Sequence, residues 1–441
     1  MVRVAVTGLG CITPIGNTVA EFREAMYEGR SGIAPFDRTA RRFPGMTGDD
    51  PGLRFKTTGL VTNFDPANNP AQKLSTGIAA STDPSAQFGI VSARQAVEDS
   101  GVLKHYDPST MAVIIGCGCG GRAADEEANR GLYTRNARIS PLGIVRAMSS
   151  SGASNIAIET GVTGPVLNIS TACASGTHAI GLAFHMVRSG QAAAAIAGGY
   201  EAALTWGFLR AWDSMRVVSP TVCRPFAADR DGMTLGEGAA MLVLEPLDAA
   251  VARGAHIYAE IVGFGMSADA HHITQPRAEG AALAIRRAID DITLTLGGPF
   301  MEPHSGEMSG VERSLEHTWA SRIGYINAHG TGTPTNDAVE AAAIHQALGP
   351  HAPHIPVGAT KSLTGHSIGA AGAIEALATA LALDAASLPH TANVGVVDPT
   401  LDLDVIVDAP RPLAPGKDVA LSNSLAFGGL NAVLAFRRHE R

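Results

Sequence analysis

The sequence predicts an α/β protein built from one strand-and-helix unit that occurs twice. Short apolar runs of strand length alternate with longer stretches of helical periodicity, which is typical of sheets covered by helices on both faces. Four strand-and-turn landmarks of the first half recur in the same order in the second half. A chain of 441 residues with 45% hydrophobic residues can bury two such cores. We expect the halves to comprise residues 1–255 and 256–441.

Composition narrows the classes of function and location. The net charge of −8 argues against nucleic acid or an anionic membrane as the main partner. Five cysteines, an odd number, and no recognisable secretory leader favour free thiols in a reducing cytosol. No uninterrupted apolar stretch reaches the roughly 18 residues of a membrane-spanning helix. We therefore predict a cytoplasmic protein.

The first half opens with a predicted strand at residues 2–7 that breaks at Gly8-Leu9-Gly10. A Gly-x-Gly pair after a first strand can indicate dinucleotide binding, but Thr13 stands at the third glycine position and Pro14 interrupts the helix that should follow. A tight turn is the preferred interpretation, and no cofactor is predicted. The other expected elements are surface loops at 36–85, helices at 86–100 and 140–159, strands at 111–116, 192–198 and 239–244, and a helix ending near Met215.

A glycine turn at residues 116–121 contains Cys117 and Cys119. A Cys-x-Cys pair can ligate a metal ion, yet the chain has no second cysteine pair of suitable spacing. We therefore predict thiols that pack within the turn, and no metal site.

Cys173 stands at a predicted turn between a strand and a helix. A short strand at residues 166–169, predicted to be buried, precedes it, and a helix that ends at Gly190 follows it. A thiol at this turn faces unpaired backbone N–H groups and the positive end of the helix dipole, which stabilise a thiolate. A buried structural cysteine is the alternative.

The second half repeats the first. Predicted strands at 259–265, 323–327, 355–360 and 419–422 correspond to those at 4–10, 111–116, 166–169 and 193–199, and a helix at 365–383 corresponds to the one after Cys173. Residues 296–318 break the symmetry and are predicted to form an exposed insertion. The charged stretch at residues 224–238 is interpreted as a salt-bridged scaffold beneath the Cys173 turn, with a second functional loop as the alternative.

Two histidines of the second half point to chemistry at Cys173. His329 and His366 each follow a predicted strand and stand among glycines that admit a ligand. Turns after corresponding strands of a duplicated sheet converge on one pocket. A cysteine and two histidines gathered there offer a nucleophile and two polarising hydrogen-bond donors. Solvated bystander histidines are the alternative.

Over nearly the whole chain, the sequence resembles the β-ketoacyl-acyl carrier protein synthases of the elongating, KAS II-like type. The matching stretches are 171–176 (TACASG), 329–333 (HGTGT), 361–366 (KSLTGH), 423–429 (NSLAFGG), and 230–232 with 236–238. The resemblance implies the thiolase fold, a layered αβαβα arrangement. Residues 257–276 and 215–220 are most similar to nodulation-type ketosynthases.

The resemblance also implies roles. Cys173 would carry the acyl group, the N–H groups of Cys173 and Phe427 would form the oxyanion hole, and His329 and His366 would stabilise the enolate formed when malonyl-acyl carrier protein loses carbon dioxide. Lys361 and Glu375 would orient His366. Thr331 and Thr333 would bind pantetheine, and Thr274 would contact substrate. Asp337 and Glu340 would form a structural carboxylate pair, with a cation linked to it as an open alternative.

The implied partners are an acyl carrier protein bearing acyl and malonyl groups, and a second ketosynthase chain in a homodimer or heterodimer. Arg135, Arg138 and Arg216, with Lys73, are the candidates for docking the acidic carrier protein. Cys119 would close the far end of the acyl pocket at the dimer interface, where the family usually has a branched aliphatic residue.

Two departures from the family pattern suggest an altered pocket wall. Met233 replaces the usual aromatic residue, and the Phe-Gly-Phe loop reads Leu425-Ala426-Phe427. A thiolase would need a second cysteine in a base motif, and a Cys-His-Asn synthase would have Asn in place of His366. A non-catalytic chain-length-factor partner, the alternative function, should lack Cys173.

Overall fold

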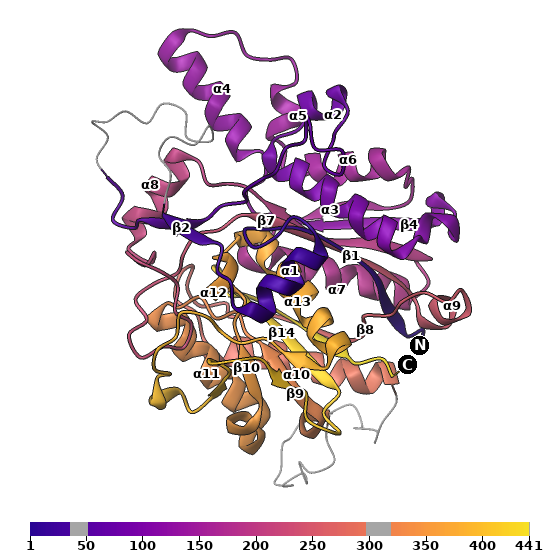
Figure 1. Ribbon diagram of the computed structural model, residues 1–441, viewed down its shortest axis with the longest axis vertical. Coiled ribbons are helices and arrows are strands. Elements are labelled where there is room, and N and C mark those ends of the chain that lie inside the picture. The colour runs from indigo at the N-terminus through magenta and orange to yellow at the C-terminus, as the bar shows by residue number, and fades with distance from the viewer. Residues whose placement is uncertain (36–51, 297–318, 441) are drawn as a thin grey trace.

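The computed structural model describes residues 1–35, 52–296 and 319–440 (Figure 1). Its core is an 11-stranded sheet in the order β12-β10-β9-β14-β15-β8-β1-β7-β6-β4-β5. The first half contributes β1 (Val4–Ile12), β4 (Met111–Gly116), β5 (Val166–Ile169), β6 (Ala194–Glu201) and β7 (Gly238–Pro246). The second contributes β8 (Ala259–Ala268), β9 (Ile323–Asn327), β10 (Pro356–Gly358), β12 (Asp404–Val405), β14 (Val419–Ala426) and β15 (Leu430–Arg437).

The strand order confirms the duplication. From the centre outward, β1-β7-β6-β4-β5 in the first half matches β8-β15-β14-β9-β10 in the second. The two arms meet through the antiparallel pair of β1 and β8. Two small sheets complete the strands: β2 (Ile33–Pro35) with β3 (Thr57–Gly59), and β11 (Ser387–Leu388) with β13 (Arg411–Pro412).

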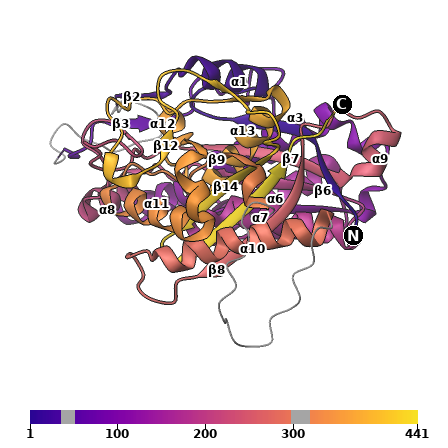
Figure 2. The same ribbon diagram turned by 90° about the horizontal axis from the view of Figure 1, so that it is seen from below.

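The helices form three layers around the two arms (Figure 1). In the central layer, α7 (Ser175–Arg188) packs on α13 (Ala371–Ala385), and both contact strands of both halves. One outer layer has α3 (Pro84–Ser100) and α6 (Ser151–Thr160), and the other has α10 (Ala278–Leu296) and α11 (Pro334–Leu348). Figure 2 shows the molecule from below, with α10 and α11 of one outer layer nearest the viewer. This is the predicted αβαβα arrangement. The remaining helices are α1 (Val19–Glu28), α2 (Thr76–Ser81), α4 (Arg122–Arg135), α5 (Gly143–Ala147), α8 (Trp206–Met215), α9 (Leu247–Ala252) and α12 (Lys361–Thr364).

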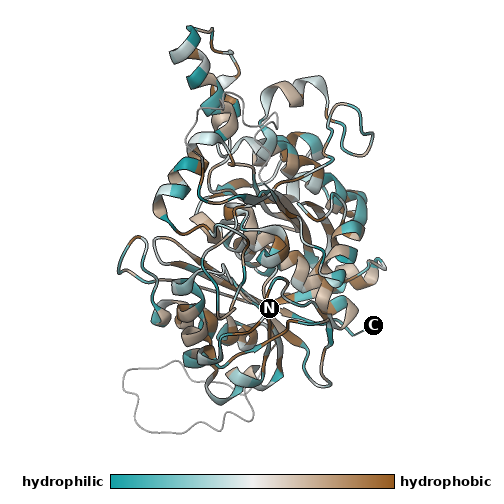
Figure 3. Ribbon diagram, turned by 60° about the vertical axis from the view of Figure 1, so that its left-hand side comes forward, coloured by the Kyte–Doolittle hydropathy of each residue, from teal (hydrophilic) through white to brown (hydrophobic). Residues whose placement is uncertain are grey.

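The central layer explains the most apolar stretch of the sequence. Among the described residues, one segment is long and apolar enough to cross a membrane, Ile368–Ala385, and 89% of it is buried inside the fold. It is the core helix α13 with the turn before it, and its alanines allow close packing between the two arms. Figure 3 shows the hydrophobic colouring concentrated in the central strands and helices, with more hydrophilic residues on the outer ones.

The prediction that the first strand ends at Gly8 is wrong, because β1 continues to Ile12. These glycines allow close helix packing instead of a turn. A Cβ atom on Gly8 would lie 2.2 Å from the carbonyl oxygen of Ala96, and one on Gly10 would lie 2.0 Å from that of Ser92, both on α3. The missing side chains therefore let α3 lie directly on the strand.

Two helix boundaries and the burial of one strand also differ from the prediction. The helix predicted at 140–159 is divided into α5 and α6 by a turn at residues 148–150, and the helix predicted at 365–383 begins only at Ala371, after α12 and a 3-10 turn. The strand before Cys173 is not buried: β5 is the edge strand, and Leu167 is 48% exposed. Residues 297–318 of the predicted insertion at 296–318, and residues 36–51 of the predicted loops at 36–85, lie outside the described residues.

Candidate active site

Cys173 lies in a tight turn between β5 and α7. The preceding residue, Ala172, has a φ of 50°, in the left-handed region that side chains rarely adopt. The Ser175 hydroxyl holds this turn, since it accepts from the N–H of Thr171 at 2.9 Å and donates to the carbonyl of Ala172 at 2.6 Å. The chain thereby turns sharply enough to aim the nearly buried thiol away from α7 and toward the second half.

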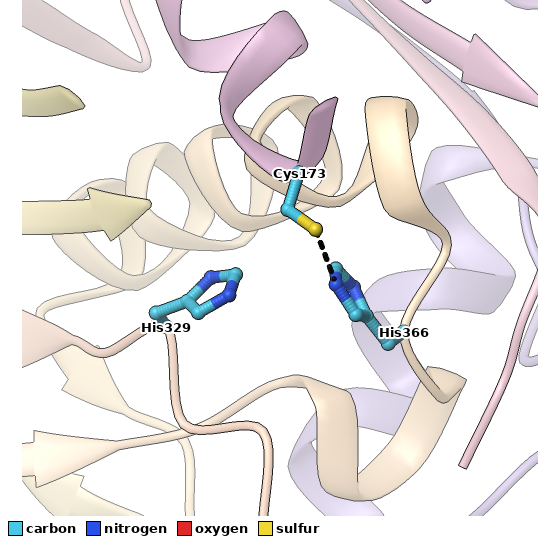
Figure 4. Close-up of side chains that lie close together, drawn as sticks. All are labelled: Cys173, His329 and His366. Carbon is cyan, nitrogen blue, oxygen red and sulfur yellow. Dashed lines mark hydrogen bonds between the residues drawn. The ribbon is translucent and has the colours of Figure 1, made fainter. Parts of the chain in front are cut away.

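The two histidines meet Cys173 from the opposite half (Figure 4). His366 Nε2 lies 3.0 Å from Cys173 Sγ. The His329 and His366 rings are 5.3 Å apart and nearly perpendicular, and one ligand atom from each of the three residues falls within 4.8 Å of the others. The structure thus brings together the three residues that the sequence analysis grouped.

The Lys361–Glu375 pair contacts His329, which corrects the prediction that it orients His366. Lys361 Nζ donates to His329 Nδ1 at 3.1 Å, to the His329 carbonyl at 2.6 Å, and to Glu375. Because an ammonium group can only donate, His329 Nδ1 is an acceptor and the ring carries its proton on Nε2. His329 therefore presents an N–H donor to the site.

A second layer of buried carboxylates holds the loop that carries His329. Glu340 accepts from the N–H groups of His329 and Gly330, both at 2.8 Å. Asp337 accepts from the N–H groups of Phe226 at 2.8 Å and Gly332 at 3.2 Å. Burial raises the pKa of both carboxyl groups, and that of Asp337 reaches about 6. These contacts place the predicted carboxylate pair in a supporting position behind the site.

The charged stretch at 224–238 serves as a scaffold, with one part reaching the site. Arg224 pairs with Asp231 at 3.1 Å, and Arg230 pairs with Asp398 at 2.6 Å. Asp231 and Met233 also line the cavity beside Cys173. Arg224 and Arg230 therefore belong to the predicted scaffold, while Asp231 and Met233 match the alternative of a second functional loop.

Burial determines the protonation of all three central groups. It lowers the pKa of His329 and His366 well below the usual value for histidine, and the positive charge of Lys361 lowers both further. It raises the pKa of Cys173 to about 12, although Lys361 and the N–H of Phe427 lower that pKa in part. The prediction of a stabilised thiolate is therefore wrong for the resting site. The thiol is neutral and needs a base, and His366 Nε2 is in contact with it.

A cavity of about 380 Å³ opens onto these groups. Its wall includes Cys173, His329 and His366, together with the predicted residues Thr274, Thr331, Thr333, Phe427 and Arg216. The Thr331 and Thr333 hydroxyls lie 2.9 Å apart, and Phe427 stacks on Trp212 with ring centres 5.9 Å apart. The cavity therefore leads from a wall of hydroxyl groups to the buried thiol.

Other predicted residues lie away from this cavity. Arg135 and Arg138 are exposed at and just beyond the end of α4, and Lys73 is exposed before α2. Cys119 is half-buried in the turn after β4 and is not part of the cavity wall.

Sequence reasoning missed two residues that support the site. Glu201, fully buried at the end of β6, accepts from the N–H groups of Gly118 at 2.9 Å, Cys119 at 3.0 Å and Gly369 at 3.2 Å. Burial raises its pKa to about 7. His178 lies against the Cys173 turn, with its Nδ1 2.9 Å from the Thr171 hydroxyl. Glu201 could have been found from the sequence, because a glutamate at the end of an otherwise apolar strand indicates a buried carboxylate with a specific partner.

A neutral thiol beside two neutral imidazoles, in an αβαβα fold with a cavity leading to the sulfur, defines a thiolase-type condensing enzyme. The chain belongs to the beta-ketoacyl synthase family. Residues 1–250 match the beta-ketoacyl synthase N-terminal domain, and residues 302–395 match its C-terminal domain.

Relatives over the full length agree with this assignment. The chain is 40% identical to a 3-oxoacyl-[acyl-carrier-protein] synthase 2 of Synechocystis, covering 99% of this chain and 98% of the relative. It is 36% identical to nodulation protein E of Rhizobium leguminosarum bv. trifolii, with 99% of each chain covered.

Solved structures also match across the whole chain. The ishigamide ketosynthase/chain length factor has a TM-score of 0.85 and 32% identity, with 100% of each chain covered. A type II PKS ketosynthase in complex with its acyl-carrier protein has a TM-score of 0.82 and 29% identity, covering 99% of this chain and 100% of the other.

Proposed function

We propose that this protein condenses malonyl-acyl carrier protein with an acyl group held on Cys173, releasing carbon dioxide and a 3-oxoacyl-acyl carrier protein two carbons longer. The family and the full-length 3-oxoacyl-[acyl-carrier-protein] synthase relative support this reaction. The observation that carries it is the contact of the buried Cys173 thiol with His366 Nε2 at 3.0 Å, with His329 beside it.

In the first step, the neutral Cys173 thiol gives its proton to His366 Nε2 and the sulfur attacks the incoming acyl thioester. The pantetheine thiol leaves with that proton, and the acyl group stays on Cys173. The N–H groups of Cys173 and Phe427 are the proposed donors to the oxyanion. The N–H of Phe427 lowers the pKa of the Cys173 thiol, which supports its proposed role as a donor beside the sulfur.

In the second step, the malonyl thioester loses carbon dioxide, and its electrons move onto the thioester oxygen as an enolate. His329 Nε2–H, fixed by Lys361, donates to that oxygen. His366 also donates, because the acylated sulfur no longer gives a proton to Nε2 and the ring proton can then lie on that nitrogen. The enolate carbon then attacks the acyl carbon, the bond between that carbon and the Cys173 sulfur breaks, and the sulfur leaves as a thiolate that takes up a proton from solvent. Neutral donors suit this step because charge develops only as the reaction proceeds.

We further propose an acyl carrier protein as the partner, a dimer with a second ketosynthase chain, and a cytoplasmic location. The acyl-carrier protein complex of the similar ketosynthase supports the partner, and the ketosynthase/chain length factor structure supports the dimer. The boundary between the halves, at residues 255 and 256, falls between α9 and β8.

Mass spectrometry of the purified chain tests the function. Incubation with acyl-carrier protein is expected to add one acyl group to Cys173, and addition of malonyl-carrier protein is expected to remove it as a 3-oxoacyl product. An unmodified Cys173, with the carrier protein correctly acylated, would favour the non-catalytic chain-length-factor function instead.

Charge reversal at Arg135 and Arg138 is expected to raise the apparent KM for acyl-carrier protein several-fold. The chain is net negative, so attraction of an acidic carrier protein must come from a local basic patch, and both side chains are exposed. Steady-state kinetics at low salt measures the effect, with cerulenin labelling of Cys173 expected to stay unchanged. An unaltered KM would remove these residues from the docking surface.

Cys119→Phe is expected to shorten the longest acyl chain that the protein accepts. Cys119 is half-buried, and a Cβ atom on the adjacent Gly118 would lie 3.3 Å from Ile368 Cγ2, two residues after His366. The family usually has a branched aliphatic residue here, and cysteine has about two heavy atoms fewer than isoleucine. Since each buried methylene is worth roughly 0.8 kcal/mol, the smaller side chain should let the pocket accept long or unsaturated acyl chains.

A ladder of acyl-carrier substrates measures this length limit, with Cys119→Ala as the matched small-residue control. If the limit stays the same in Cys119→Phe while the dimer remains intact, Cys119 only packs against the partner subunit.

A further inference from the structure

The site has the donor set of a metal centre. Cys173, His329 and His366 offer one sulfur and two ring nitrogens within 4.8 Å of one another, and all three are buried. One thiolate and two imidazoles, with a fourth position open to a cavity, match the ligands and the open geometry that Zn²⁺ adopts in catalytic sites.

The surroundings of His329 oppose metal binding. A histidine that binds a metal through one nitrogen normally donates its other ring N–H to a carboxylate, a carbonyl or water. Here His329 Nδ1 faces the Lys361 ammonium at 3.1 Å, and that ammonium also contacts the His329 carbonyl and Glu375. The ring proton is consequently held on Nε2.

We propose that Cys173, His329 and His366 form a latent site for zinc-like thiophilic cations, and that Lys361 keeps this site closed. Metal binding would release the Cys173 thiol proton to solvent and move the His329 ring proton from Nε2 to Nδ1. That proton would then face an ammonium group, and the ammonium charge would repel the cation.

Lys361→Gln is the variant that tests the proposal. The glutamine carbonyl can accept from His329 Nδ1–H, and its amide can donate where the ammonium donated, so the variant supplies the acceptor that a metal-binding histidine needs. Titration with Co²⁺ is read from the thiolate-to-cobalt charge-transfer band in the near ultraviolet and the visible bands of tetrahedral cobalt. We expect Co²⁺, and Zn²⁺ in competition with it, to bind at least 100-fold more tightly than in the unsubstituted protein.

Two control variants identify the source of any band. Lys417→Gln removes a partly buried lysine that donates to the Ser321 carbonyl in another part of the fold, and it is expected to titrate like the unsubstituted protein. Adding Cys173→Ser to Lys361→Gln is expected to remove the charge-transfer band. A folded Lys361→Gln protein without the band, or with the affinity of the unsubstituted protein, would overturn the proposal.

A measurement on the unsubstituted protein does not depend on the variant's folding. Zn²⁺ should protect Cys173 from iodoacetamide only at concentrations at least 100-fold above those that protect Lys361→Gln, or Lys361→Met if the glutamine variant does not fold. Protection of the unsubstituted protein by micromolar Zn²⁺ would show that Lys361 does not close the site, whatever the variants do.

Discussion

Cys173→Ala is expected to abolish condensation, lowering its rate by at least about 10⁴-fold, while some malonyl decarboxylation remains. The Cys173 sulfur is the nucleophile that carries the acyl chain in the proposed mechanism, whereas the two imidazoles that donate to the enolate stay in place. The measurement combines radiolabelled acyl transfer with release of carbon dioxide from malonyl-carrier protein.

Cys11→Ala provides the matched control for Cys173→Ala. Cys11 is also a buried cysteine, but it lies on β1 within the hydrophobic core. Its variant should acylate and condense at near-normal rates. Elongation by Cys173→Ala at a normal rate would show that the proposed mechanism is wrong.

His329→Ala is expected to lower malonyl decarboxylation by about 10³-fold, the usual order for the loss of one oxyanion donor. Lys361 holds the ring proton on Nε2, so the lost group is an N–H donor aimed into the site. His329→Gln, whose amide N–H reaches about as far as Nε2–H, should retain more activity than His329→Ala. The rate of carbon dioxide release is measured for His329→Ala, His329→Gln and the unsubstituted protein.

The control for His329→Ala is His345→Ala. His345 lies on α11, where its Nε2 is 3.1 Å from the Leu401 carbonyl, and it does not line the cavity. Equal decarboxylation by His329→Ala and His345→Ala would exclude His329 as the donor.

The lowered pKa of both imidazoles also gives this second prediction a pH dependence. A depressed histidine pKa means that the neutral form persists below the usual titration range, so decarboxylation should stay level between pH 6 and 8. The rate should decline only in more acidic solution. A decline centred on the ordinary histidine pKa would show that the groups are solvated during turnover.

The local sequence was sufficient to predict several of the buried strands, the duplication and the candidate residues. Strand-length apolar runs bounded by glycine gave β4 and β9 with the bounds that the structure has, because a buried strand needs apolar side chains over its whole length. The repeated order of landmarks predicted that turns from both halves would meet. The geometry at Cys173, His329 and His366 agrees with that expectation.

Tertiary structure alone decided which side chain contacts which, and with what charge. Lys361 and Glu375 lie beside His329, although Lys361 is nearer to His366 in sequence, because α12 directs the lysine toward the β9 turn. Gly8 and Gly10 were predicted to form a turn, but they lie within β1 and lack side chains where α3 packs on the strand. The Cys173 thiol has a raised pKa because burial outweighs the nearby N–H group and Lys361. Desolvation depends on every atom packed around a group, and those atoms come from segments far apart in the chain.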